Sequence, residues 1–160
     1  MESLELLNMC RSYEEDMLKL RQHLELLSDM AGSLSAAGSG GGGGQGPGDR
    51  TGRFAVKLAE ANEIISLRQM MHESEQLAVC HLLEGCVALE GRVLHRYYVR
   101  GDTLDNIAKK LSYSREYIRR KRREGVEKLP QNVPEGFLPK EYARWYKRYK
   151  AYEAKIVVQT

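Results

Sequence analysis

The sequence predicts an all-α protein: an N-terminal antiparallel helical hairpin of coiled-coil type, a helix-turn-helix and a C-terminal helix. Three observations point to this class. Apolar residues recur at helical spacing along most of the 160-residue chain, one Gly-rich stretch interrupts them early, and positive charge concentrates in the second half. We expect the hairpin over residues 1–84, the helix-turn-helix over 85–129, and a linker with the last helix over 130–160.

The first expected element is one long helix over residues 1–31 with a narrow apolar seam. The intervening positions are largely charged, and a seam this narrow indicates that the helix needs a partner. Its members alternate at steps of four and three residues: Leu6, Cys10, Tyr13, Met17, Leu20, Leu24, Leu27 and Ala31.

A second long helix, from about Phe54 to Glu84, is the expected partner. Between the two helices, residues 32–53 are rich in Gly and Ser and are predicted to form a flexible linker. Two amphipathic helices joined in this way most simply fold back on each other. The second helix carries its apolar residues at helical spacing: Leu58, Ala61, Ile64, Leu67, Met71, Ser74, Ala78 and Leu82.

Two features of the hairpin could be taken for ligand sites, and neither pattern supports one. The Gly-rich stretch lacks the GxxxxGK[ST] pattern and the flanking strand of a phosphate-binding loop. His72 and His81 fall on the polar flank of the second helix without a partner, so we interpret them as surface residues.

Charge separates the two halves of the chain. Residues 1–31 have a net charge of −4, whereas residues 92–128 carry twelve basic against five acidic side chains, a net charge of +7. A concentrated positive surface attracts phosphate, so the basic half is expected to bind an anionic partner.

Within this basic half the capping residues predict three short helices. The first ends at Gly101, the second begins after Thr103, and the third begins after Ser114. In the second, Leu104, Ile107, Ala108 and Leu111 form the expected buried side.

The third helix has two separate faces. On a helical wheel Ile118, Gly125 and Leu129 fall together on an apolar or small face. The polar face carries Arg115, Glu116, Arg119 and Arg123. A helix that packs by the first face and presents arginines on the second suits reading of the DNA major groove, where guanidinium groups bond guanine O6 and N7. The alternative is an ordinary solvated basic helix.

The segment YYVRGDTLDNIAKKLSYSREYIRRKRREGVEKL resembles the region-four helix-turn-helix of bacterial sigma factors. The resemblance covers Leu94 to Leu129, and SREYIRR is especially close to the start of the recognition helix in housekeeping sigma factors. The whole layout is similar to ArpU- and RinA-like late-gene regulators of phages and prophages. That similarity implies a transcriptional regulator that acts on double-stranded DNA in the bacterial cytoplasm.

The resemblance also implies which side chains meet DNA. The candidate base-contacting residues are Arg115, Glu116, Arg119 and Arg120. By charge and position, the candidate phosphate-contacting residues are Thr103, Lys109, Lys110, Ser114, Tyr117, Arg122 and Arg123. A single helix-turn-helix binds weakly, so a homo-oligomer formed through the hairpin is expected.

The C-terminal segment is expected to form a basic aromatic helix after the Pro-containing stretch PQNVPEGFLP. We expect its aromatic side to dock onto the helix-turn-helix, with the basic rim adding phosphate contacts. The alternative is that it lies along DNA or contacts RNA polymerase. The aromatic side is formed by Tyr142, Trp145 or Tyr146, Tyr149 and Tyr152.

Other classes of function find little support in the sequence. No catalytic set with usable spacing appears, the three cysteines lack paired CxxC motifs, and no run of eighteen apolar residues occurs. We therefore expect no enzyme activity, cofactor, metal or membrane span. The rival function is a small-terminase-type DNA-packaging protein, which a helix-turn-helix on a coiled-coil oligomer fits equally.

Overall fold

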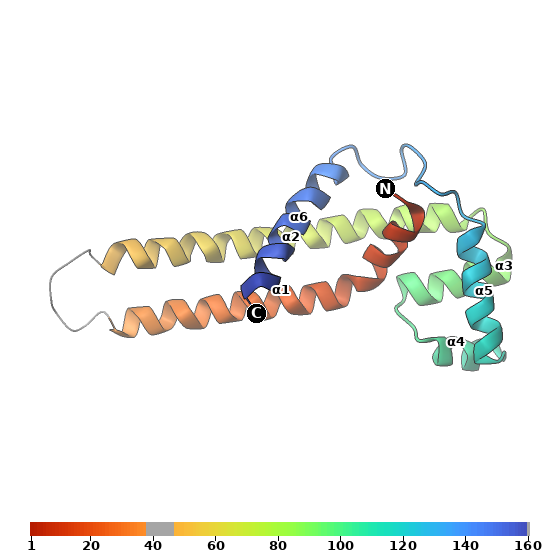
Figure 1. Cartoon of the computed structure of the whole chain (residues 1–160), viewed down its shortest axis with the longest axis horizontal. Helices are drawn as coiled ribbons and strands as arrows, with labels where there is room; N and C mark the ends of the chain where they lie inside the picture. Colours follow the sequence, from red (N-terminus) through yellow and green to blue (C-terminus); the bar gives the residue numbers. More distant parts are fainter. Residues whose placement is uncertain (38–46, 160) are drawn as a thin grey trace. The chain divides into compact units, whose positions relative to one another are not determined.

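The computed structural model describes residues 1–37 and 47–159, and within these ranges regular structure is helical (Figure 1). The all-α prediction is confirmed. The elements in chain order are α1 (Ser3–Ala37), α2 (Pro47–Leu83), α3 (Ala88–Leu94), the π-helical turn η1 (His95–Val99), α4 (Leu104–Leu111), α5 (Arg115–Glu127) and α6 (Tyr142–Gln159). No helix in the described part of the chain is long and apolar enough to cross a membrane.

The chain forms two compact units, and both long helices contribute to each. The first unit contains Met1–Tyr13 and Met70–Arg144, and the second contains Glu14–Gln69 and Trp145–Thr160. The sequence patterns suggested boundaries near residues 84 and 129 instead. The difference arises because the first turns of α1 and the last turns of α2 pack with the short helices that follow.

The core of the first unit joins the start of α1 to the end of α2. Leu6, Leu7 and Cys10 pack with Ala78 and Val79 in a cluster that also contains Leu82, Leu94 and Tyr98. Four of these eight residues, Leu6, Cys10, Ala78 and Leu82, belong to the predicted seams. Both helices form because each buries an apolar stripe that would be exposed on an isolated helix.

The N-terminal residues also hold the segment that leaves α5. The backbone N–H of Ser3 donates to the carbonyl of Gln131 at 2.9 Å, and the N–H of Val133 donates to the carbonyl of Met1 at 3.0 Å. Glu2 and Asn132 form an isolated antiparallel bridge. The exit of α5 is therefore fixed by residues more than 120 positions earlier.

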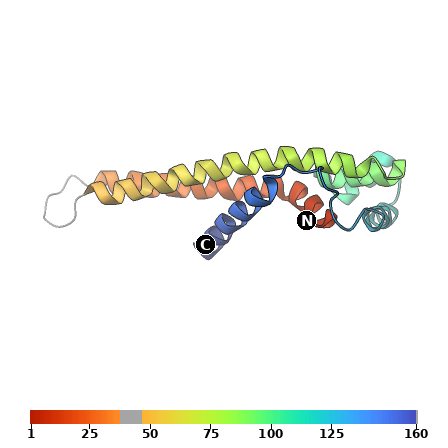
Figure 2. The ribbon, with the colours of Figure 1, turned by 90° about the horizontal axis from the view of Figure 1, so that it is seen from above.

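In the second unit, residues 14–37 of α1 and 47–69 of α2 lie antiparallel, as both views of the ribbon show (Figures 1 and 2). Met17, Leu20, Leu27, Ala61, Ile64 and Leu67 are buried. A buried ion pair lies among them: Nε of Arg68, which is fully buried, is 3.0 Å from Oδ2 of Asp16.

The position of α6 differs from the predicted one. Residues 145–159 of α6 pack in the second unit with the hairpin helices, and not onto the helix-turn-helix as the aromatic pattern suggested. Tyr149 and Tyr152 are buried there, so the aromatic side is core. Part of the basic rim pairs with α2: Nη2 of Arg148 lies 2.6 Å from Oε2 of Glu63.

Helices also extend into the predicted linker. Residues 32–37 continue α1 and residues 47–53 begin α2, whereas residues 38–46 lie outside the described residues. His72 is a second correction to the hairpin: it is not a surface residue, because its ring stacks on Tyr13 at 3.7 Å between centroids and is half-buried. His81 is exposed, as expected.

Candidate nucleic-acid interface

Two capped helices, α4 and α5, form the scaffold of the candidate interface. The hydroxyl of Thr103 accepts the backbone N–H of Asn106, and that of Ser114 accepts the N–H of Tyr117, both at 3.2 Å. Ser112 ends α4 in the left-handed region, with φ of 60°. Both predicted N-caps are thus confirmed, and each satisfies a backbone donor that the first turn leaves unpaired.

The inner face of α5 packs as its sequence predicts. Ile118 is fully buried in a cluster with Val93, Ile107 and Ala108. Gly125 lies against α3, where a Cβ at this position would come within 3.0 Å of Leu94 Cδ1. A side chain at residue 125 would require the Leu94 side chain or α5 itself to shift, so glycine permits the close approach of α5 to α3.

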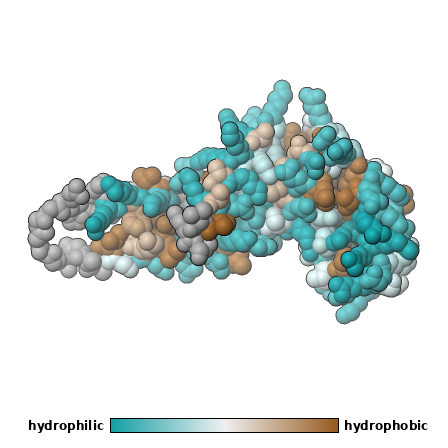
Figure 3. Space-filling model, viewed as in Figure 1, coloured by the Kyte–Doolittle hydropathy of each residue, from teal (hydrophilic) through white to brown (hydrophobic). Residues whose placement is uncertain are grey.

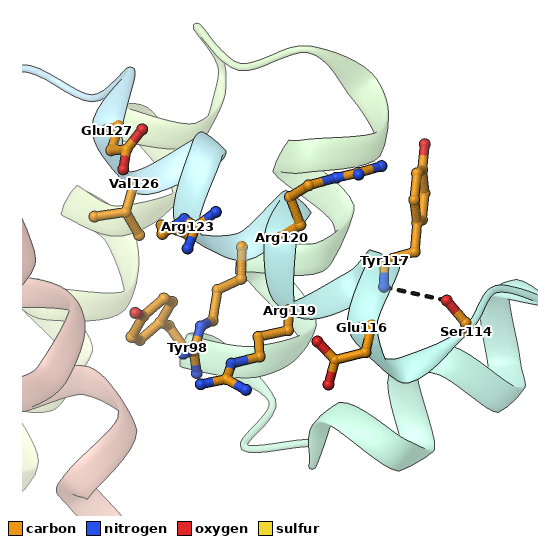
Figure 4. A pocket seen from close by; sticks show the side chains of 10 residues that line it. Tyr98, Ser114, Glu116, Tyr117, Arg119, Arg120, Arg123, Val126 and Glu127 are labelled. Carbon is orange, nitrogen blue, oxygen red and sulfur yellow. Dashed lines mark hydrogen bonds between the residues drawn. The ribbon is translucent and has the colours of Figure 1, made fainter.

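The outer face of α5 carries the predicted base-contacting residues. Arg115, Glu116, Arg119 and Arg120 are all exposed, and hydrophilic residues cover much of this part of the molecule in Figure 3. A concave surface of about 780 Å³ runs along the helix (Figure 4). It brings together seven of the predicted site residues: Ser114, Glu116, Tyr117, Arg119, Arg120, Arg122 and Arg123.

The arginines of this surface differ in how far they are already engaged. The side chains of Arg119 and Arg123 have no ion pair or hydrogen bond with the residues that the structure describes. Arg115 lies 3.5 Å from the carboxylate of Asp105, and Arg120 lies 3.7 Å from that of Glu124. The unpaired guanidinium groups are available for a base edge or a phosphate without first losing a partner.

Acidic residues modulate the charge of α5. Lys121 donates to Glu124 at 3.0 Å. This hydrogen bond raises the pKa of Lys121 and lowers the pKa of Glu124, so both are charged at neutral pH. Glu124 therefore neutralises part of the positive charge beside Arg120, and Glu116 and Glu127 line the same concave surface as Arg119 and Arg123 without pairing to them.

Three of the predicted phosphate contacts, Thr103, Lys109 and Lys110, lie outside the concave surface. Lys109 and Lys110 are exposed near the end of α4, and Thr103 is exposed at its start. The hydroxyls of Thr103 and Ser114 are already used as helix caps. Tyr117 is half-buried and stacks on Tyr113, with ring centroids 4.7 Å apart.

One group of residues near the interface was missed by sequence reasoning. Tyr97 in η1 lies beneath two guanidinium groups, Arg122 of α5 at 4.4 Å and Arg11 of α1 at 3.7 Å from its ring centroid. Arg11 also donates to the carbonyls of Tyr97 and Asp102. The first carbonyl lies within the π-helical turn and the second lies shortly after it, so α1 supports the element whose Tyr97 stacks with Arg122.

No sequence pattern predicts that Arg11, Tyr97 and Arg122 come together. Arg11 and Tyr97 are 86 positions apart, and arginine on a charged helix face is ordinarily a solvated residue. Tyr98, the next residue of the same motif, lines the concave surface. Burial raises the pKa of its phenol, so the side chain is neutral beside the arginines.

The geometry therefore combines a capped helix pair, a fixed recognition helix and an exposed row of arginines. Residues 88–131 match the Sigma-70, region 4 family model. This region-4 segment covers α3, η1, α4 and α5, and it supports a DNA-binding helix-turn-helix. No curated protein and no solved structure gave a significant match to the chain.

Proposed function

We propose that the protein is a sequence-specific transcriptional regulator of phage or prophage genes, in which α5 reads the major groove. The main support for this proposal is that the region-4 segment contains α5, the helix on which the side chains of Arg119 and Arg123 are exposed and unpaired. A B-DNA major groove admits an α-helix, and an exposed guanidinium can bond both acceptors of a guanine. In this function Arg115, Glu116, Arg119 and Arg120 contact bases.

Phosphate contacts on either side of α5 would fix its register on the duplex. Lys109 and Lys110 approach the backbone from α4, and Arg122 and Arg123 approach it from α5. Arg122 is stacked on Tyr97, so its guanidinium is held in place before DNA arrives. Such pre-ordering lowers the entropic cost of forming the contact.

The assignment to phage or prophage genes is supported by the layout of the chain. A hairpin with a Gly/Ser interruption followed by a sigma-like helix-turn-helix is similar to the ArpU- and RinA-like regulators. Two further expectations follow for this class: the protein pairs with a second copy to occupy two half-sites, and it acts together with RNA polymerase in the bacterial cytoplasm.

Selection of bound duplexes from a random DNA pool, at about physiological salt, tests the proposal. We expect recovery of a short motif, as an inverted or direct repeat if two copies bind together. Tight binding with no recovered motif would contradict sequence reading. Sizing of the protein in solution then separates the rival function, because a large ring favours a small-terminase-type packaging protein and a dimer or tetramer favours regulation.

A further inference from the structure

A second groove in the first unit lies apart from the recognition surface. It has a volume of about 550 Å³ and is formed by the end of α2 and by α3 with η1. It shares no residue with the concave surface along α5, because η1 contributes Tyr98 to that surface and His95 to this groove. The volume is within the range of about 300–1,000 Å³ that ligand-binding pockets occupy.

One side of the groove is basic. Arg92, Arg96 and Arg100 follow one another at four-residue steps along α3 and η1, with His95 between them. The Arg92 side chain has no ion pair or hydrogen bond with the described residues. Asp102 engages Arg96 at 3.3 Å, whereas Arg100 lies 3.9 Å from the same carboxylate and is half exposed.

Acidic side chains do not neutralise this row. Glu84 is the only carboxylate among the described residues that line the groove, and its side chain lies 3.6 Å from the imidazole of His81. Asp102 carries one negative charge against the two arginines that it approaches. A positive charge therefore remains at the rim after the internal pairs are counted.

The rest of the lining, called the floor below, is apolar or small: Leu83 at the end of α2, Cys86 in the connection that follows, and Ala88 and Gly91 in α3. Burial raises the pKa of the Cys86 thiol, so this residue presents a neutral, weakly polar surface. A phosphate backbone has no apolar surface to cover such a floor, whereas an amphipathic peptide has one.

We propose that this groove binds an acidic amphipathic segment of a partner protein, with apolar side chains on the floor and carboxylates against Arg92 and Arg100. The occupant is inferred from charge complementarity together with the apolar floor. The proposal concerns protein recognition and does not depend on the reading of DNA by α5. The two can therefore fail separately.

The test uses the full-length protein, labelled with ¹⁵N, and two synthetic helical peptides of about three to four turns. The first peptide carries leucines on one face and glutamates on the other, and the second keeps the glutamates but has serine in place of leucine. Amide shifts are expected at residues 83–100 with the first peptide. Loss of the leucines is expected to weaken binding about tenfold or more.

Matched variants identify the surface. The double change R92Q and R100Q is expected to weaken binding of the first peptide about twofold to thirtyfold, the effect of removing two exposed ion pairs. The control double change R119Q and R123Q removes two exposed arginines from α5 and is expected to leave peptide affinity unchanged while it weakens DNA binding.

A second measurement is independent of the arginine variants. Cys80 is exposed at the edge of the groove, so bound peptide is expected to slow its alkylation. The proposal is overturned if neither peptide binds, if both bind equally, or if the R119Q and R123Q control weakens the peptide as much as the groove variant. Amide shifts at the groove on addition of a DNA duplex, with displacement of the peptide, would assign the groove to nucleic acid and also overturn it.

Discussion

The two compact units place arginine in opposite environments. In the first unit Arg119 is exposed on α5 and has no partner among the described residues. In the second unit Arg68 is fully buried, pairs with Asp16 at 3.0 Å, and lies 5.4 Å from the ring centroid of Tyr149. The comparison teaches that residue type does not decide whether an arginine binds a ligand or holds a fold. Burial and the presence of an internal partner decide it.

The largest expected effect breaks the buried pair. Asp16→Leu leaves the Arg68 guanidinium buried without its carboxylate, and the free energy of unfolding is expected to fall by about 3–5 kcal/mol. Urea denaturation measures this loss. The control is Glu15→Ala, which removes the neighbouring exposed pair between Glu15 and Lys19 and is expected to leave the free energy of unfolding nearly unchanged. Equal losses in the two variants would contradict a structural role for the buried pair.

The next effect concerns the attachment of the recognition helix. Gly125→Leu places a side chain against the buried Leu94, and the first unit is expected to lose about 1–3 kcal/mol of stability by overpacking. Affinity for DNA should fall as well, because α5 must move. Gly52→Leu is the matched control, since that helical glycine has no atom within 4 Å of the added Cβ. Thermal unfolding of both variants measures the difference. If Gly125→Leu is no less stable than Gly52→Leu, the residues around position 125 accommodate the added side chain without cost.

Replacing an exposed arginine of α5 is expected to affect DNA binding and not stability, the opposite of the effect expected for the buried Arg68 pair. Arg119→Ala should weaken binding to the selected DNA motif by about 1–3 kcal/mol and relax base preference. Its effect on the free energy of unfolding should stay within about 0.5 kcal/mol, as for other surface changes. Binding titrations with the motif and with random duplex provide the measurement.

Lys110→Ala is the comparison for Arg119→Ala, because a contact to phosphate does not depend on the base sequence. It is expected to weaken the motif and random duplex alike and to reduce the salt dependence of binding by about one unit of slope. If Arg119→Ala also weakens both duplexes equally, base reading by Arg119 is excluded.

The smallest expected effect is a pH dependence confined to the second unit. Burial, with a smaller effect from Lys57, lowers the pKa of His23 below its ordinary value of 6.5. As pH falls from 6.5 towards the pKa of the folded state, the unfolded chain binds the proton first, so His23 lowers stability. Its stabilising effect is therefore complete above pH 6.5. His23→Gln should flatten the decrease in unfolding free energy below that pH, and an unchanged profile would remove His23 as its source.

Much of the candidate interface could be predicted because its signals are local. The caps at Thr103 and Ser114 act within three residues of themselves. The buried side of α5 follows from helical periodicity, which placed Ile118 and Gly125 together before any partner helix was known. Seven of the predicted contact residues then line one concave surface, since they already share one helix or its cap.

Contacts between distant residues were not predictable in the same way. Nothing in the spacing distinguishes Arg68 from a solvated arginine, because its burial depends on the approach of α1 and α6 in the second unit. The aromatic side of α6 was correctly expected to be covered, but its partner was wrong. The apolar face of an amphipathic helix predicts which side is buried, but it does not predict which element covers that side.

By itself, the sequence determined the helical class, the helix starts at Thr103 and Ser114, and the face on which α5 presents its arginines. Only the tertiary structure decided that Arg11 supports Tyr97 and Arg122, that the N-terminal residues hold the exit of α5, and that Arg68 is buried. The physical reason is the range of each cause. Propensity and capping act over a few residues, whereas packing selects one arrangement from many that the same local pattern permits.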